Sequence, residues 1–247
     1  MFYFGSNTKR DLSLAAHLSI TKSALKISNN YSDSRIFLLP AMPLMTMLRS
    51  KAKGSRLWIG NQAISATTGS DVTGEVSAKL VKSLGSDLVL IGHAERRALF
   101  DGDRTISSQL KLASACNLRI LFCIGESRAL KDKAALRKFL RNQLQALARI
   151  QTPVIVAYEP VFSIGVRGKP ANPSYVATAL GIISEELARL GLNKTPILYG
   201  GSVNPDNAAL YAALDHCHGL FVGRSAWSAG GFEKVFLAGH NAFKAKN

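Results

Sequence analysis

Cysteine is scarce in this chain of 247 residues, which has only Cys116, Cys123 and Cys217. Their odd number and the lack of a C-x-x-C pair argue against a disulfide framework and for a reducing compartment. No apolar run reaches the roughly 18 residues of a membrane span, and no charged segment precedes an apolar core at the N-terminus. We therefore expect a cytoplasmic protein with no signal peptide and no membrane partner.

Acidic residues are also few. Sixteen Asp and Glu stand against 31 Lys and Arg, which gives a formal net charge of +15 at pH 7. Such a charge fits nucleic-acid binding, attraction of a small anionic substrate, or a basic surface with no specific partner. The basic residues are scattered, and their one concentration, at 128–149, follows a helical pattern without the interleaved aromatic residues that stack on bases. We therefore expect no nucleic-acid partner.

Short apolar runs alternate with longer amphipathic segments along the chain. Strands are predicted at residues 2–6, 35–41, 56–62, 88–92, 119–125, 154–159, 196–200 and 220–223. Helical patterns cover residues 12–27, 75–84, 104–115, 129–150, 173–190, 205–213 and 231–244. This order predicts one α/β domain, residues 1–247, with a parallel sheet built from right-handed crossovers. At this length a closed (β/α)8 barrel fits best, and a doubly wound open sheet is the alternative.

Polar residues and glycines collect just after the predicted strands, where an eight-stranded barrel has its active site. The polar side chains there are Asn7, Lys9, Asn61, Gln62, His93, Glu95, Glu126, Glu159, Ser202 and Arg224. A doubly wound sheet would instead concentrate its glycines after the first strand, and the segment GSN at 5–7 is not a G-x-G-x-x-G motif. No Ser-His-acid triad is evident either.

Glu159 ends a continuous apolar run and precedes Pro160 and a segment with two glycines, 163–170. A carboxylate fixed at a strand end beside a movable lid is an arrangement typical of enzymes. Lid closure expels water and raises the basicity of the carboxylate, as abstraction of a proton from carbon requires. The alternative is a structural glutamate beside an ordinary surface loop.

His93 and Lys9 are the other candidate catalytic residues. His93 opens the helical segment AERRALF, and the positive potential of a helix N-terminus disfavours the imidazolium. A neutral His93 could donate a hydrogen bond to a substrate carbonyl. Lys9 follows the first strand and could stabilise an enolate or a phosphate. The alternatives are a satisfied core or surface histidine and an ordinary surface lysine.

Two glycine-containing segments, YGGSV at 199–203 and FVGRS at 221–225, follow the last two predicted strands. Barrels bind phosphate at this position through unpaired backbone amides. His216, Cys217 and His218 could ligate a metal, but adjacent residues do not readily converge on one ion. We therefore expect a loop or strand entrance at 216–218 and no metal site.

Seven motifs stand in the order in which they occur in the triosephosphate isomerase family: N-x-K at 7–9, TGE at 73–75, IGHAERR at 91–97, CIGE at 123–126, AYEPVF-x-IG at 157–165, YGGSVNP at 199–205 and LFVGR at 220–224. The chain resembles this family over nearly its whole length. The resemblance implies a TIM barrel, a sugar-phosphate isomerase of glycolysis and gluconeogenesis without a cofactor, and a homodimer whose interface includes Thr73. It also implies that Arg96 supports that interface or the site.

By the same resemblance, Glu159 moves a proton between adjacent substrate carbons, His93 polarises the carbonyl and Lys9 stabilises the enediolate, roles for which this family is itself the standard example. Asn7 would contact the substrate. The phosphate would be held by Gly165, Ser202, Gly223 and the backbone amide of Arg224, and not by the Arg224 guanidinium.

Several residues depart from the family pattern. Thr8 replaces the usual aromatic residue, Phe162 stands where Trp is usual, the lid segment IGVRGKPA at 164–171 is one residue longer, and GRSAW at 223–227 replaces GGASL. The changes in the lid and in GRSAW, with DRT at 103–105, resemble a related group that isomerises erythrulose phosphates.

We therefore expect interconversion of dihydroxyacetone phosphate and glyceraldehyde 3-phosphate. Interconversion of L-erythrulose 1-phosphate and D-erythrulose 4-phosphate by the same mechanism is the alternative. A basic barrel that binds nucleic acid or acts as a scaffold is a third hypothesis, and the intact set of Lys9, His93 and Glu159 argues against it.

Overall fold

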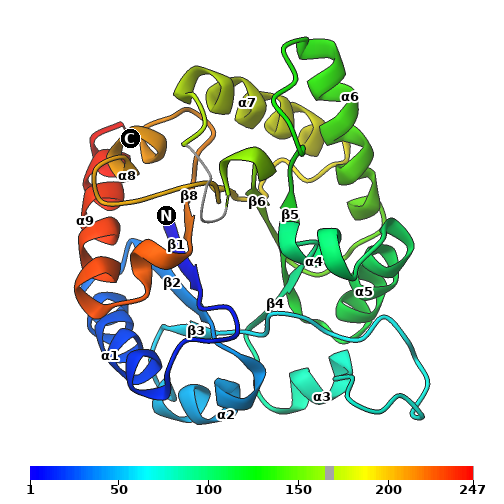
Figure 1. Cartoon of the computed structure of the whole chain (residues 1–247), viewed down its shortest axis with the longest axis vertical. Helices are drawn as coiled ribbons and strands as arrows, with labels where there is room; N and C mark the ends of the chain where they lie inside the picture. The colour runs from blue at the N-terminus through cyan, green and yellow to red at the C-terminus, as the bar shows by residue number, and fades with distance from the viewer. Residues whose placement is uncertain (165–169, 247) are drawn as a thin grey trace.

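Eight parallel strands occupy the centre of the computed structural model, which describes residues 1–164 and 170–246 (Figure 1). The strands are β1 (Phe2–Asn7), β2 (Ser34–Leu39), β3 (Trp58–Ile59), β4 (Leu88–Ile91), β5 (Arg119–Ile124), β6 (Val154–Tyr158), β7 (Ile197–Tyr199) and β8 (Gly219–Val222). Their order in the sheet is β3-β2-β1-β8-β7-β6-β5-β4, so the first and last strands of the chain are neighbours.

An isolated parallel bridge between Asn61 and Val89 joins the two edges of this sheet. The Asn61 amide donates to the Leu88 carbonyl at 2.9 Å, and the Leu90 amide donates to the Asn61 carbonyl at 2.8 Å. The sheet therefore closes into the predicted (β/α)8 TIM barrel, and the alternative of an open doubly wound sheet is wrong. β3 is shorter than the predicted 56–62, because the closing contact beyond Ile59 is this single bridge and not a continuous ladder.

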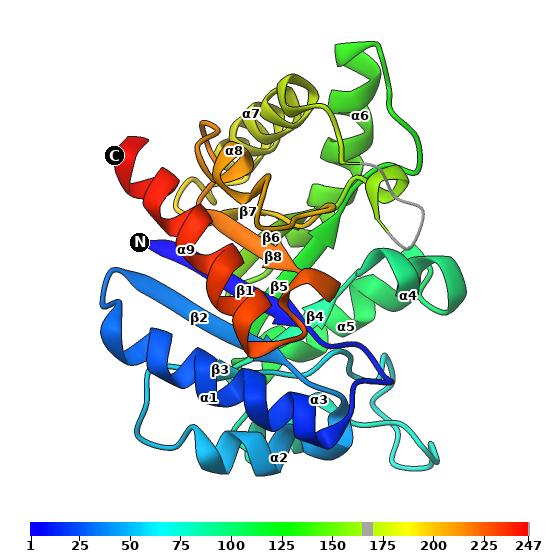
Figure 2. The same cartoon turned by 60° about the vertical axis from the view of Figure 1, so that its left-hand side comes forward.

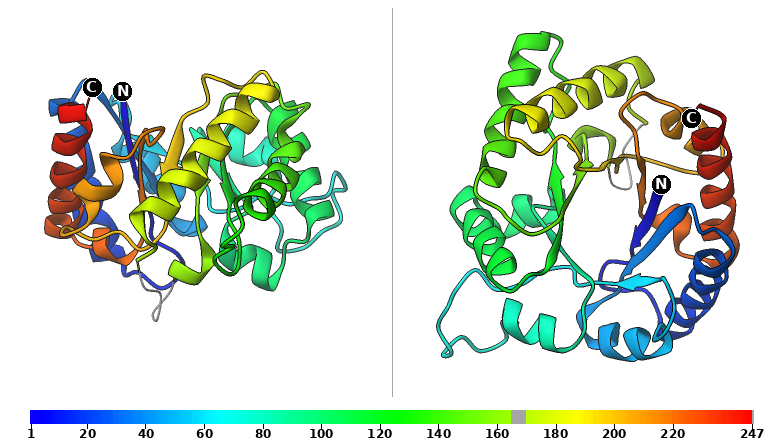
Figure 3. Two further views of the ribbon diagram at one scale, coloured as in Figure 1. Left: turned by 90° about the horizontal axis from the view of Figure 1, so that it is seen from above. Right: turned by 180° about the vertical axis from the view of Figure 1, so that it is seen from behind.

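Helices surround the strands on the outside of the barrel, as views from above and from behind show (Figure 3). They are α1 (Leu14–Asn30), α2 (Met42–Lys51), α3 (Ala78–Ser83), α4 (Ala94–Leu99), α5 (Asp103–Ala115), α6 (Lys133–Leu144), α7 (Pro173–Arg189), α8 (Ala208–Ala212) and α9 (Ala229–Lys246). Side-chain oxygens of Ser13, Ser77, Asp132 and Asn172 accept N–H groups in the first turns of α1, α3, α6 and α7.

Helix α2 is absent from the prediction made from the sequence. It buries only Met45 and Leu48, so its apolar periodicity is weak, and Pro43 stands in its first turn. Proline is tolerated there because the first N–H groups of a helix have no intrahelical partner. The same residue reads as a helix breaker when the sequence is seen alone.

The barrel has two apolar layers. Side chains inside it form a compact core of Phe37, Leu39, Leu88, Leu90, Leu121, Cys123, Ile155, Ala157, Leu198 and Phe221. The alternate residues of the same strands, such as Ile36 and Phe122, pack outward against the helices. Burial on both faces explains why the strands are continuous apolar runs instead of alternating ones.

Helices α1 and α9 lie beside β1 and β2 (Figure 2). The Phe4 ring packs edge-on against Phe232 and Phe236 of α9, with ring centroids 4.9 and 5.5 Å apart. These contacts pack the C-terminal helix α9 against the first strand of the chain. This arrangement leaves the loops at the carboxyl ends of the strands, at the opposite end of the barrel from the N-terminus, to form the site.

Residues 216–218 form the entrance to β8, as predicted. His216 has a positive φ of 60°, and Nδ1 of His218 accepts the Ile197 amide N–H at 3.1 Å. Among residues 1–164 and 170–246, no group of three His, Cys, Asp or Glu is arranged to hold a metal ion. Within the same ranges, no helix has the length and apolar character needed to cross a bilayer.

Candidate active site

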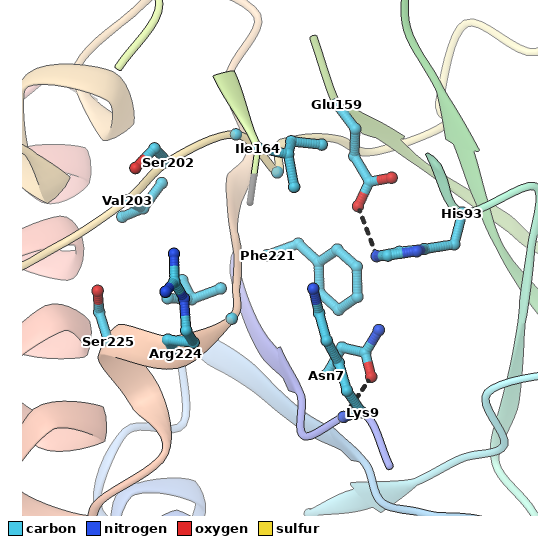
Figure 4. Close-up of a pocket in the computed structure, with 14 residues that line it drawn as sticks. Asn7, Lys9, His93, Glu159, Ile164, Ser202, Val203, Phe221, Arg224 and Ser225 are labelled. Atoms are coloured by element: carbon cyan, nitrogen blue, oxygen red, sulfur yellow. Dashed lines mark hydrogen bonds and ion pairs between the residues drawn. The ribbon is translucent and has the colours of Figure 1, made fainter. Parts of the chain in front are cut away.

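A cavity of about 100 Å³ opens at the carboxyl ends of the strands (Figure 4). It brings together seven of the eight site residues predicted from the sequence: Asn7, Lys9, His93, Glu159, Ser202, Gly223 and Arg224. The eighth, Gly165, lies outside the described residues, as does Arg167. Ile164, Val203, Phe221 and Ser225 also line the cavity and were not among the predicted site residues.

Glu159 directly follows β6 and is 2% exposed. Its Oε1 lies 3.5 Å from His93 Nε2, and its Oε2 accepts the Ala94 amide N–H at 3.3 Å. A Cβ at Gly200 would lie 2.9 Å from the Glu159 Cγ, so the glycine after β7 leaves room for this side chain. The carboxylate is thus fixed in place and faces the cavity.

His93 precedes α4 and accepts the Glu95 amide N–H through Nδ1 at 3.2 Å. Because a backbone N–H can only donate, Nδ1 carries no proton, and a neutral His93 carries its proton on Nε2. That nitrogen points toward Glu159 and the cavity (Figure 4). With this tautomer the histidine presents a hydrogen-bond donor to the cavity.

Lys9 lies just beyond β1 in the left-handed region, with φ at 53°. This conformation costs a residue with a Cβ about 1–2 kcal/mol. The Asn7 Oδ1 accepts the Lys9 amide N–H at 2.9 Å, and the Gln62 side chain donates to the Lys9 carbonyl at 2.9 Å. The Lys9 ammonium pairs with the Glu95 carboxylate. These contacts place the charge at the cavity mouth.

Ser202, Arg224 and Ser225 lie on the wall of the cavity opposite Glu159 and His93 (Figure 4). They belong to the loops after β7 and β8, and a 3-10 turn, η3 (Arg224–Ala226), begins directly after Gly223. A Cβ at Gly223 would meet no atom within 4 Å, so this glycine leaves open space in front of the turn. Donors on one wall and a base with its acid partner on the other suit a small substrate with an anionic tail.

The model of one family, described as triosephosphate isomerase, matches residues 3–238. The chain belongs to the triosephosphate isomerase family. It is 33% identical to the L-erythrulose-1-phosphate isomerase of Rhizobium meliloti (strain 1021) over 239 residues, and this match covers 93% of each chain. It is also 37% identical over 208 residues to the triosephosphate isomerase of Bdellovibrio bacteriovorus, 83% of this chain and 86% of that one. The L-erythrulose-1-phosphate isomerase of Mesorhizobium japonicum is 30% identical over 94% of each chain.

Membership of the triosephosphate isomerase family identifies the chain as an isomerase. The relatives are named for two different substrates, so the comparison does not identify the substrate of this chain. The residues around the cavity have to be considered for that.

Cys123, in β5, is a further residue at the site of this isomerase. Burial raises the pKa of its thiol well above the ordinary value, and a hydrogen bond and the charge of Glu159 raise it further. The thiol therefore stays protonated beside the carboxylate and is no nucleophile. The sequence placed Cys123 at a strand end but gave no sign of this contact, because it depends on the stagger between β5 and β6.

Two other residues near the site of this isomerase were noticed in the sequence, but no role was predicted for them. Gln62 was recognised as a polar residue after a strand and Trp227 as a departure from the family pattern, but neither received a role. The structure places both against the loop of Asn7 and Lys9. A polar side chain at the end of a predicted strand was the available signal for Gln62, and the replacement of GGASL by GRSAW was the signal for Trp227.

Proposed function

We propose that this protein interconverts dihydroxyacetone phosphate and glyceraldehyde 3-phosphate by proton transfer through an enediolate, without a cofactor. The observation that carries the proposal is the pairing of a buried carboxylate with the protonated Nε2 of a neutral histidine, 3.5 Å apart at the cavity. Glu159 removes a proton from the substrate carbon next to the carbonyl, while His93 donates a hydrogen bond to the carbonyl oxygen. The same carboxylate returns the proton to the adjacent carbon, so the product is an isomer.

Lys9 supplies the charge that this chemistry needs. As the proton leaves, negative charge develops on the substrate oxygens, and a fixed ammonium at the mouth of the cavity stabilises it. Hydrogen bonds hold the backbone of Lys9 in place. Its charge therefore does not have to be repositioned when the enediolate forms, which lowers the barrier.

The phosphate group is assigned to the opposite wall of the cavity. Ser202, Gly223 and Arg224 line that wall. We assign the phosphate to Ser202, Gly223 and the Arg224 amide, and the sugar end to Asn7. Gly165, which lies outside the described residues, belongs to the same proposal as a residue that holds the phosphate. The charge of +15 favours encounter with a phosphorylated substrate in general.

A second substrate is favoured by a specific observation, the exchange of GGASL for GRSAW at 223–227, which brings Arg224 to the cavity wall. Two of the relatives described above are named L-erythrulose-1-phosphate isomerase. Isomerisation of L-erythrulose 1-phosphate to D-erythrulose 4-phosphate requires the same base, acid and ammonium, but one additional carbon must fit in the cavity.

The deciding experiment is kcat/KM for glyceraldehyde 3-phosphate and for L-erythrulose 1-phosphate, measured side by side on the pure protein. A triose value near the diffusional limit of about 10⁸ M⁻¹s⁻¹ supports the leading proposal. A triose value lower by several orders of magnitude, with efficient erythrulose turnover, replaces it with the second.

We also propose that the protein is a homodimer in the cytoplasm. Leu99 and Phe100 are 71% and 69% exposed and line a groove of about 660 Å³ that reaches Lys9 and Glu95. The long connection between β3 and α3, which contains Thr73, extends away from the barrel (Figure 1). Exposed large apolar side chains beside a groove favour a protein partner, and a second copy supplies an extended segment of matching kind. The free cysteines fit a reducing compartment.

A further inference from the structure

Trp227 joins two segments of the site that are 220 residues apart in sequence. It directly follows η3, and its indole Nε1–H donates to the backbone carbonyl of Asn7 at 2.9 Å. That carbonyl stands at the end of β1, two residues before Lys9. The tryptophan therefore ties the loop after β8 to the loop that presents the lysine.

Other hydrogen bonds hold the lysine loop from its remaining sides. The Lys9 amide N–H donates to Asn7 Oδ1 at 2.9 Å. The Gln62 side chain donates to the Lys9 carbonyl at 2.9 Å and to the Leu39 carbonyl at 2.9 Å. A left-handed residue with a side chain persists only where its surroundings hold it. Trp227 ties this loop to the side of the cavity where the phosphate is proposed to bind.

We propose that Trp227 is a positioning residue that holds the Asn7–Lys9 loop in register with the turn at Gly223 and Arg224. The inference rests on the proposed function of Lys9. Trp227 lines the adjoining groove with Lys9 and Glu95 and is not part of the cavity wall, so it acts through the Asn7 carbonyl and not by touching substrate. Because Arg224 and Trp227 stand at the two ends of one short turn, an anion bound at that turn steadies the lysine loop through the indole.

The test is Trp227→Phe, which keeps an aromatic ring and removes the N–H donor. Trp58→Phe is the matched control, because Trp58 is the chain's other tryptophan and its ring stacks on Arg119, 3.8 Å away, at the start of β3. We expect Trp227→Phe to lower kcat about tenfold, the effect of one lost hydrogen bond, with KM changed less than about twofold. Trp58→Phe should leave both values unchanged.

A double-mutant cycle separates positioning from general damage. If Trp227 acts through Lys9, then Trp227→Phe lowers the residual rate of the Lys9→Ala protein by less than about twofold. An equal loss in both backgrounds would overturn the proposal, and so would an unchanged kcat in the background with Lys9 intact.

A binding measurement keeps the test independent of turnover. In the Trp58→Phe protein all tryptophan emission comes from Trp227, and we expect it to change saturably with added inorganic phosphate, whose binding is followed in parallel by equilibrium dialysis. Phosphate that binds without changing the emission would overturn the link between the turn and the lysine loop. If the emission changes but neither sugar phosphate is turned over, the proposed function fails while the link stands.

Discussion

Replacing Glu159 by glutamine removes the proposed base and leaves a side chain of almost the same shape. In the native site Oε1 lies 3.5 Å from His93 Nε2, and Oε2 accepts the Ala94 N–H at 3.3 Å. The glutamine carbonyl oxygen can keep the contact with Ala94. Its amide group then faces the Nε2–H of His93, so two donors meet where a donor and an acceptor stood.

The loss in rate follows from these contacts. A positioned general base contributes about 10²–10⁴-fold to a proton transfer, and glutamine cannot accept the proton at all. The donor–donor contact also turns His93 away from the carbonyl, so we expect kcat to fall by at least about 10³-fold. The free energy of unfolding should stay within about 1 kcal/mol of the native value or rise, because a buried carboxylate without a strong ion pair is removed.

The assay is isomerisation of the preferred sugar phosphate, followed by loss of substrate and by exchange of the transferred proton in D₂O. Glu159→Asp is the matched control, because it keeps the carboxylate but withdraws it by one methylene, and a displacement of this order costs about 10²-fold. A folded Glu159→Gln protein with kcat within tenfold of the native value would refute the assignment of the base. So would an aspartate variant slower than the glutamine variant.

Three further predictions concern stability, thiol reactivity and assembly. A hydrogen bond from Arg141 lowers the pKa of Glu186 below its ordinary 4.5, so its stabilisation is present above that pH and is lost as the pH falls through the lowered value. Glu186→Gln should therefore lower the free energy of unfolding by about 1–2 kcal/mol at neutral pH and by almost nothing near about pH 2, as urea unfolding at both pH values will measure. At pH 8 the half-buried Cys116 should react with a thiol reagent at least tenfold faster than Cys123, whose pKa burial raises, and mass mapping of a fast Cys123 would contradict this. Thr73→Arg should convert the proposed dimer to a monomer in sedimentation velocity, and an unchanged sedimentation coefficient would count against the proposed interface.

The strands were predictable because their residues are buried on both faces. Continuous apolar runs such as residues 154–158 are typical of a strand that buries alternate side chains inside the barrel and against the helices. Predicted and observed strand bounds differ mainly at β3, where barrel closure by one bridge leaves a ladder of two residues. Closure depends on the stagger of all eight strands, and no local segment encodes it.

The site was predictable to the extent that it follows strand ends. Lys9, His93 and Glu159 each stand within three residues of a strand's last residue, so the fold alone brings them to one rim. The left-handed backbone of Lys9 could not be foreseen in the same way. This conformation is held by hydrogen bonds from the Lys9 amide to the Asn7 side chain and from the Gln62 side chain to the Lys9 carbonyl. Gln62 is 53 residues away in sequence, so this contact appears only in the folded chain.

The replacement of Trp by Phe162 illustrates why a local departure from a pattern is hard to interpret without the fold. Phe162 has no polar hydrogen, yet its ring lies edge-on to the Tyr175 ring of α7, with centroids 5.9 Å apart. The Tyr175 hydroxyl donates to Glu126 Oε1 at 2.8 Å, as does the Tyr158 hydroxyl, and burial raises the pKa of Tyr175 to about 12. Burial also raises the pKa of Tyr158, so both phenols stay protonated as donors at any ordinary pH. The buried Glu126 carboxylate thus receives hydrogen bonds from β6 and α7, and the Glu126 backbone carbonyl accepts the Val161 amide N–H at 2.9 Å, so residue 126 also holds the segment that contains Phe162.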